Sequence, residues 1–391
     1  MQNADTVRST EQSLVADAFR GYWRWRLPLI FGAALAFASG LVTSVEGAAI
    51  TAGNLVVYRV GDGAAALTAN ATAVFLDEYT VSGTLVQSIP LSTTGTDSLT
   101  AVGTATTEGI ITLSQNGTTL LFTGYRKDVG GSSPSSDPAT TNRVIASVGL
   151  SGVVDTSIAL TDVTGSVRSA TTVDGSFYYA ALTTGVRYVP APGPAATSVS
   201  IDTRNSREVL LNDNILYASN GSTGTNTFKV QSYGVLPTAT TAAMPLIILA
   251  TADAVNGFAL FDLDATVPGV DTMYCLSTVE NRLRKYSFDG ANWNPSGSTS
   301  AGLAQDLTGF QNGTAISLIL SSPSSLLPFT DLTGYNGSID GLTLDPAIAT
   351  AGTNTAFRGI AYIPVPEPST AVLCGLMAWL ALGLRRARRQ A

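Results

Sequence analysis

Three aspartates lie close together near the middle of the sequence, two in Phe261-Asp262-Leu263-Asp264 and the third at Asp271. Asp262 and Asp264 alternate, so on a strand they would project from the same face, and Asp271 could join them across a turn. Carboxylate oxygens are the hard ligands that Ca²⁺ prefers. The spacing therefore suggests a calcium site, although aspartates also simply cap turns between strands. No other cofactor is indicated.

A second acidic pair, Asp77-Glu78, lies nearer the N-terminus. Paired carboxylates can perform general acid–base catalysis without histidine. Adjacent residues on a strand point to opposite faces, however, so these two cannot flank one bond. The sequence contains 0 histidines, which excludes Ser-His-Asp and Cys-His catalysis and imidazole metal sites. We therefore expect a protein without catalytic residues.

Aromatic side chains in polar loops could stack on sugar rings. Trp293, within residues 290–295, is the strongest candidate for ligand binding because a polar turn surrounds it. The alternative is that the aromatic residues mostly fill the core. The net charge of −7 argues against a nucleic-acid partner, because phosphate binding needs a clustered positive surface. Of the two cysteines, Cys275 is expected to be a small buried core residue.

Turn signals divide the body of the chain into short strands. Asn-Gly begins at residues 116, 220, 256, 312 and 336, and Asp-Gly at residues 62, 174, 289 and 340. These dipeptides supply the positive φ angles of two-residue hairpin turns. No segment of the body has a sustained helical period of apolar residues. The sequence therefore predicts an all-β body.

A weak repeat recurs every 39 to 57 residues or so, which is near the size of a four-stranded propeller blade. Its aromatic strands centre near residues 122, 178, 217, 274 and 362, with a fainter one near 319. We predict a β-propeller of seven blades, within a range of six to eight, over residues 50–364. Residues 56–60 are expected to pair with residues 358–362 and close the ring. A pair of β-sandwiches or a β-helix are the competing folds.

The N-terminal residues 1–49 have the order of a secretory signal peptide with an extended N-terminal region. Arg20, Arg24 and Arg26 precede an apolar run over residues 27–42, and small residues follow at 47–49. We expect export through the Sec translocon. A retained membrane anchor is the alternative.

The C-terminal residues 365–391 contain Pro366-Glu367-Pro368, an apolar stretch over residues 371–384, and the basic cluster Arg385, Arg386, Arg388 and Arg389. The arginines should stay cytoplasmic, so both ends place the body outside. This arrangement resembles the PEP-CTERM sorting signal of Gram-negative bacteria. The resemblance implies that exosortase recognises the Pro-Glu-Pro motif, cuts near it, and releases the body from a transient helix in the inner membrane. A permanent tail anchor is the alternative.

The opening Thr51-Ala52-Gly53-Asn54-Leu55-Val56-Val57-Tyr58-Arg59-Val60-Gly61 also resembles a group of exported PEP-CTERM proteins of undefined function. That resemblance supports a propeller-like body and brings no known active site. From these observations we expect a secreted, non-enzymatic protein of the cell surface or biofilm matrix, whose body binds extracellular polysaccharide or has a structural role. The alternative is an exported hydrolase or lyase that acts on a polymer through carboxylates.

Overall fold

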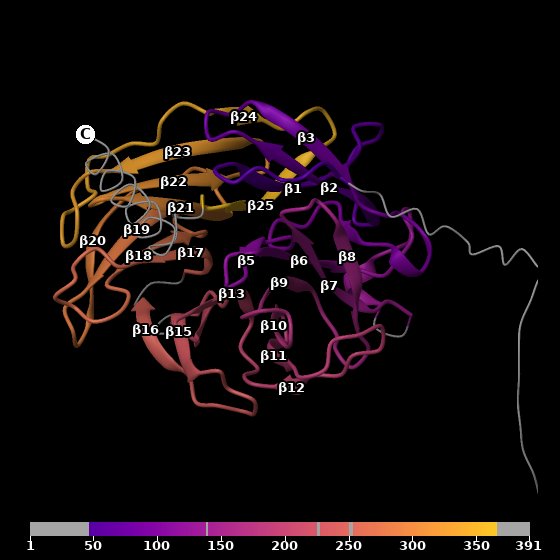
Figure 1. Ribbon diagram of the computed structural model, residues 1–391, viewed down its shortest axis with the longest axis horizontal. Coiled ribbons are helices and arrows are strands. Elements are labelled where there is room, and N and C mark those ends of the chain that lie inside the picture. Colours follow the sequence, from indigo (N-terminus) through magenta and orange to yellow (C-terminus); the bar gives the residue numbers. More distant parts are fainter. Residues whose placement is uncertain (1–46, 138–139, 225–226, 250–252, 366–391) are drawn as a thin grey trace, which may run out of the picture. The chain divides into compact units, whose positions relative to one another are not determined.

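The computed structural model describes residues 47–365, apart from residues 138–139, 225–226 and 250–252 (Figure 1). These residues form 25 strands and two short 3₁₀ helices, Gly95–Asp97 and Pro134–Ser136, which confirms the all-β class. Within the described part, no helix has the length and apolar character needed to cross a membrane. The signal helix and the C-terminal transmembrane helix predicted for the two ends fall on residues outside the described ones.

Four separate sheets contain four antiparallel strands each. In chain order they are β9 (Val167–Thr171), β10 (Tyr178–Leu182), β11 (Gly185–Val189) and β12 (Val199–Ser200); β13 (Ser206–Asn212), β14 (Ile215–Asn220), β15 (Thr227–Val235) and β16 (Met244–Leu249); β17 (Val255–Phe261), β18 (Thr272–Ser277), β19 (Arg282–Phe288) and β20 (Trp293–Ser300); and β21 (Asp306–Asn312), β22 (Ala315–Ser321), β23 (Ser325–Asp331) and β24 (Ala349–Thr350).

The remaining nine strands form one larger sheet. They are β1 (Leu55–Val60), β2 (Ala71–Tyr79), β3 (Leu85–Pro90), β4 (Thr100–Val102), β5 (Thr112–Leu113), β6 (Thr119–Tyr125), β7 (Arg143–Gly149), β8 (Val154–Leu160) and β25 (Ala356–Tyr362). Strand β2 joins two groups, because its first three residues pair with β4 and its later residues pair with β1 and β3. The arrangement is propeller-like, but the prediction of seven blades is wrong.

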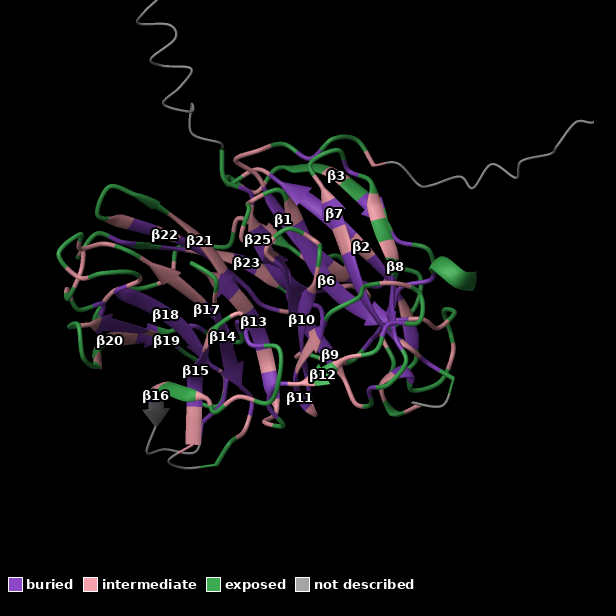
Figure 2. Ribbon diagram, turned by 60° about the horizontal axis from the view of Figure 1, so that its bottom comes forward, coloured by how far each residue is buried: buried purple, intermediate pink, exposed green. Residues whose placement is uncertain are grey.

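The first and last strands of the body pair as predicted. Val56 lies opposite Ala361 and Val57 opposite Ile360, so β1 and β25 form neighbouring antiparallel strands. Hydrophobic clusters then fill the spaces between neighbouring sheets. One such cluster joins Tyr274 of β18 to Leu318 of β22, and the buried strands appear as the purple interior of Figure 2. Another cluster, which includes Val56, Phe122 and Val144, lies within the nine-stranded sheet itself. Burial of apolar side chains both between and within sheets stabilises the fold.

One strand of each group lies nearest the centre, namely β5, β9, β13, β17, β21 and β25 (Figure 1). Short turns connect the inner strands β5, β13 and β21 to the next strand outward. The turn between β13 and β14 places Asp213 and Asn214 at φ angles of 48° and 63°, and the turn before β6 places Gly117 at 72°. Of the predicted dipeptides, those that begin at residues 62, 116, 174, 289, 312 and 340 place their glycine at positive φ, as two-residue turns require.

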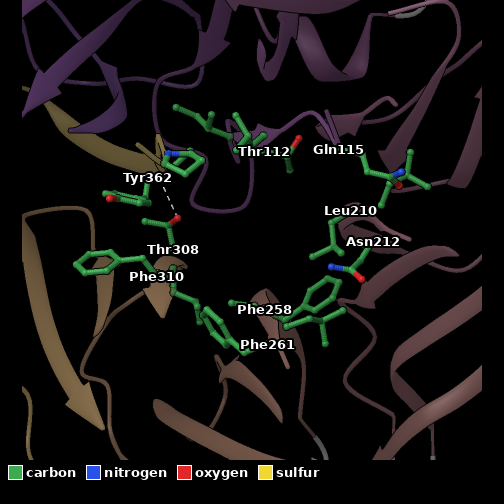
Figure 3. A pocket seen from close by; sticks show the side chains of 18 of the residues that line it. Thr112, Gln115, Leu210, Asn212, Phe258, Phe261, Thr308, Phe310 and Tyr362 are labelled. Carbon is green, nitrogen blue, oxygen red and sulfur yellow. Dashed lines mark hydrogen bonds between the residues drawn. The ribbon is translucent and has the colours of Figure 1, made fainter. Parts of the chain in front are cut away.

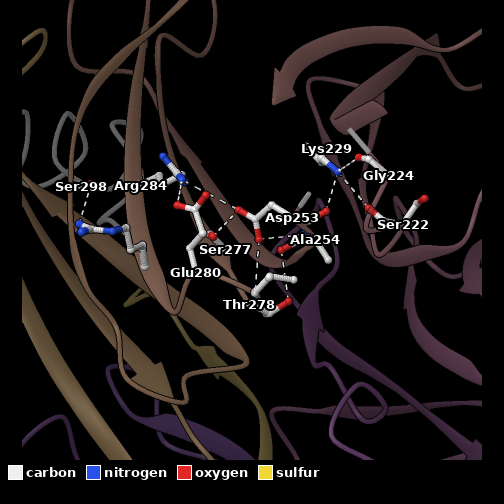
Figure 4. Close-up of polar contacts among 12 residues, drawn as sticks. Ser222, Gly224, Lys229, Asp253, Ala254, Ser277, Thr278, Glu280, Arg284 and Ser298 are labelled. Atoms are coloured by element: carbon white, nitrogen blue, oxygen red, sulfur yellow. Dashed lines mark hydrogen bonds and ion pairs between the residues drawn. The ribbon is translucent and has the colours of Figure 1, made fainter. Parts of the chain in front are cut away.

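Buried cations hold the outer loops in place, a feature that the sequence did not suggest. The ammonium of Lys229 on β15 donates to the carbonyl oxygens of Ser222, Gly224 and Asp253 at 2.9, 2.9 and 2.5 Å (Figure 4). On β19, Lys285 pairs with Asp331 at 2.8 Å, and both side chains are at most 1% exposed. Such buried cations are tolerated because carbonyl or carboxylate oxygens surround them.

Candidate functional site

A pocket of about 700 Å³, called the axial pocket below, opens where five of the six inner strands end. Its lining comes from β5, β13, β17, β21 and β25 and the turns that follow them (Figure 3). Sites of this size bind small molecules in proteins. Because each inner strand belongs to a different part of the sequence, closure of the ring is what creates the pocket.

Several aromatic side chains form part of the pocket wall. Phe310 of β21 and Tyr362 of β25 lie with ring centroids 4.6 Å apart and planes tilted by 31°. Phe261 of β17 packs edge-on against Tyr274, with centroids 5.9 Å apart. These neighbours hold the rings in place, and the rings of Phe261, Phe310 and Tyr362 are only half-buried. The wall therefore offers fixed aromatic surface to a ligand.

Glu208 of β13 is one of the residues that line the pocket. Its side chain accepts a hydrogen bond from the backbone amide of Phe258 at 2.7 Å. Its own backbone amide donates to the Ser219 hydroxyl at 3.0 Å. The residue is 5% exposed, so this carboxyl group is almost wholly removed from water while still facing the pocket.

Asp306, at the start of β21, lies behind the same region and is 1% exposed. One of its carboxyl oxygens accepts from the backbone amide of Ile360 at 3.0 Å, whereas the other, Oδ1, has no hydrogen-bond partner. Gly257 fits closely against it, because a Cβ at that position would lie 2.4 Å from Oδ1 and 2.9 Å from the Asp306 Cα. Glycine at position 257 is what allows β17 and β21 to approach here.

The two carboxyl groups influence each other's protonation. Burial raises the pKa of Glu208 well above its ordinary value, and the charge of Asp306 raises it further. Burial likewise raises the pKa of Asp306, to about 7. Two desolvated carboxyl groups that feel each other's charge cannot easily both ionise. Burial and the like charge of the neighbour therefore both favour the protonated form of Glu208.

The three aspartates of the expected calcium site are not arranged around a common point. The carboxylate of Asp271 accepts from the backbone amides of Leu263 and Asp264, at 3.0 and 2.6 Å. Asp264 accepts from the amide of Thr266 at 3.0 Å, while Asp262 is exposed beyond the end of β17. Across the described residues, no three acidic side chains are grouped so that they could hold a metal ion. Asp264 and Asp271 instead stabilise the turn.

The other sequence candidates have structural partners. Trp293, at the start of the outer strand β20, packs on Phe288 with ring centroids 5.3 Å apart, and it does not line the axial pocket. Asp77 pairs with Arg59 at 2.5 Å, and Glu78 accepts from the backbone amide of Thr51 at 2.8 Å.

The predicted sorting residues lie outside the described part of the chain. They are Pro366, Glu367, Pro368, Arg385, Arg386, Arg388 and Arg389. Cys275 is buried with a free thiol, as predicted.

Sequence reasoning missed both Glu208 and Asp306. They are 98 residues apart by their numbering, and each follows a polar residue in a segment of ordinary composition. Asn256-Gly257 was counted among the turn signals, but both residues lie inside β17, where the pairing register shifts. A hairpin dipeptide within an otherwise apolar strand was the available signal, because glycine in a strand often marks close backbone approach.

The sequence matches no protein-family model and no curated protein. Solved structures align with it at low identity. A proposed 6-phosphogluconolactonase from Bacteroides fragilis aligns at 11% identity with a TM-score of 0.47, covering 75% of this chain and 81% of that one. A chain from a nidogen–laminin complex aligns at 11% identity and 0.47, covering 79% and 98%. A periplasmic gluconolactonase from Pseudomonas aeruginosa aligns at 10% and 0.43, covering 80% and 99%.

The expected non-enzymatic role requires correction. A buried carboxyl group, Glu208, lines the pocket, and this agrees better with the alternative, an exported hydrolase or lyase that acts on a polymer through carboxylates, than with a body that has no catalytic residues. The acidic group of the pocket is also different from the one weighed in the sequence. It is Glu208 with Asp306, on two inner strands, and not the adjacent pair Asp77-Glu78.

Proposed function

We propose that this protein is a hydrolase that acts on a small substrate in the axial pocket, with Glu208 as its catalytic acid. The observation that carries the proposal is the buried pair of carboxyl groups, of which Glu208 lines the pocket and Asp306 lies behind it with an unpartnered oxygen. Catalytic groups characteristically combine burial, a like-charged neighbour and access to a cleft.

The two carboxyl groups would have different roles. The raised pKa of Glu208 favours its protonated form, which a general acid requires. Asp306 does not line the pocket, so it is a positioning residue that acts through Glu208. Its negative charge raises the proton affinity of Glu208 without contact with the substrate.

The chemistry that fits this arrangement is hydrolysis of a cyclic ester. Water adds to the acyl carbon, the bond from that carbon to the ring oxygen breaks, and Glu208 gives its proton to the departing oxygen. The attacking water then loses a proton to the Glu208 carboxylate, which restores the acid. The products are a carboxylic acid and an alcohol on one molecule, so atoms and charge balance.

The test is hydrolysis of δ-decalactone by the full chain and by Glu208→Gln, followed with a pH indicator. Glutamine retains an acceptor for the Phe258 amide but cannot deliver a proton, so we expect kcat to fall by about 10²- to 10⁴-fold. Asp345→Asn is the matched control, because Asp345 is exposed and does not line the pocket. Equal rates for the wild type and Glu208→Gln would contradict the proposal.

We also propose that the chain is exported and processed near Pro366-Glu367-Pro368 by an exosortase. This proposal rests on the order of the motif, the apolar stretch and the arginines in the sequence. Terminal-peptide mass spectrometry of envelope and secreted fractions tests it. We expect mature chains that end near the motif, and an intact tail containing Arg389 would contradict processing.

A further inference from the structure

We infer that the axial pocket selects a neutral substrate with an apolar face, and that it rejects phosphorylated and other anionic molecules. This inference rests on the proposed function, because it names the substrate class of the same site. Three properties of the pocket support it, namely its charge, its aromatic wall and its size.

The charge of the pocket is the first argument. Among the described residues that line it, the acidic ones are Glu208 and Asp213, and no lysine or arginine lines it. Phosphate and carboxylate ligands are normally held by arginine, lysine or clustered backbone amides. The negative charge of Asp213 would repel an anion in this pocket, and so would the buried pair once it ionises. The anion would also lose its hydrating water without gaining a cationic partner, which costs free energy.

The lining amides offer no substitute for a cation. The backbone amide of Tyr362 donates to the Thr308 hydroxyl at 2.9 Å (Figure 3), that of Ile360 donates to Asp306 at 3.0 Å, and that of Phe258 donates to Glu208 at 2.7 Å. These three donors, two on β25 and one on β17, are already satisfied by protein oxygens. They are not free to bind a phosphate.

The aromatic wall is the second argument. Phe310 and Tyr362 form a tilted pair, and Phe261 faces the same space (Figure 3). Rings that are held by neighbours and half-exposed can bury an alkyl chain or the apolar face of a ring at little cost in side-chain entropy. A volume of about 700 Å³ leaves room for such a group beyond the ester itself. A ligand that places its ester near Glu208 can thus lay its apolar part on Phe310.

The experiment compares three lactones on the full chain after subtraction of spontaneous hydrolysis. They are δ-decalactone, which is neutral with an alkyl chain; δ-valerolactone, which is neutral without one; and 6-phosphoglucono-δ-lactone, which is anionic. We expect kcat/KM to be highest for δ-decalactone, lower for δ-valerolactone, and at least 100-fold lower for the phosphorylated compound. Binding of δ-decalactone is measured in parallel by calorimetry.

Substitution at the wall provides the second readout. Phe310→Ala should raise KM for δ-decalactone by about tenfold, which corresponds to about 1.4 kcal/mol, and should change KM for δ-valerolactone much less. Phe75→Ala is the matched aromatic control. Phe75 lies on β2 beneath Arg59, with 4.1 Å from the guanidinium carbon to the ring centroid, and it does not line the pocket.

The outcomes separate this inference from the proposed function. Preferential hydrolysis of the phosphorylated lactone, lost in Glu208→Gln, would overturn the substrate class and leave the hydrolase proposal standing. Binding of δ-decalactone that is weakened in Phe310→Ala, without hydrolysis of any lactone, would overturn the hydrolase and keep the ligand class. Neither binding nor hydrolysis would overturn both.

Discussion

Replacing Asp306 with asparagine should change how the stability of the protein depends on pH. Burial raises the pKa of the native Asp306 carboxyl from 3.8 to about 7. A carboxyl whose pKa is higher in the folded state stabilises the fold fully below its unfolded pKa, and that stabilisation is lost as the pH rises through the folded pKa. At about 1.4 kcal/mol per pH unit, the loss between pH 4 and pH 8 amounts to at most about 4 kcal/mol.

The Asp306→Asn variant lacks this titration but keeps an oxygen that can accept from the Ile360 amide. We therefore expect nearly equal unfolding free energies for the variant and the wild type at pH 4, and a variant that is more stable by up to about 4 kcal/mol at pH 8. Urea denaturation of the full chain from pH 4 to pH 8 measures this, with Asp345→Asn as the exposed control. The same pH slope in wild type and Asp306→Asn would refute the buried, shared-charge description of the pair.

Two further substitutions test the packing around the site and around the buried cations. Gly257→Ala should lower the unfolding free energy by about 1–3 kcal/mol, because the new methyl group would lie 2.4 Å from Asp306 Oδ1. Gly352→Ala, whose Cβ would have its nearest neighbour at 3.7 Å, should leave urea unfolding almost unchanged, and equal effects of the two substitutions would contradict the packing argument. Lys285→Met should cost about 3–5 kcal/mol, because it leaves Asp331 buried without its partner. Adding Asp331→Asn should restore part of the loss, and no restoration would show that the ion pair is not the cause.

Local features of the sequence predicted the turns and the closure of the ring. Gly117 and Gly313, each in a predicted Asn-Gly dipeptide, adopt positive φ because a residue without a Cβ tolerates that conformation. The pairing of Val57 with Ile360 follows because the first and last apolar strands of a closed fold would otherwise leave exposed edges.

The number of blades did not follow from the same reasoning. Strand β2 takes part in two groups of strands, and β5 contains only two residues. The boundaries between blades are therefore irregular in the nine-stranded sheet, and the sequence repeat does not reveal them. Two of the recurring aromatic strands also differ in position. Tyr178 lies on the second strand of its sheet, whereas Tyr362 lies on the innermost strand.

The candidate site depends on contacts that no local pattern contains. Glu208 and Asp306 come together only because β13, β17 and β21 converge at the centre. The acidic residues that stood out in the sequence, Asp264 and Asp271, did so because aspartate recurs at turns, and there they accept backbone amides. Acidic residues that are close in the sequence therefore indicated turns, whereas the candidate catalytic acid, Glu208, belongs to a pair of acidic residues that are close only in the folded structure.

The protonation state of Glu208 at neutral pH is the most direct test of this account. Infrared difference spectroscopy of the full chain against Glu208→Gln at pH 7 would observe it. The account predicts a carboxylic-acid carbonyl band in the wild type that is absent from the variant, because burial and the charge of Asp306 hold the proton on Glu208. A difference spectrum that contains only carboxylate bands would show that Glu208 is ionised and would contradict its role as the catalytic acid.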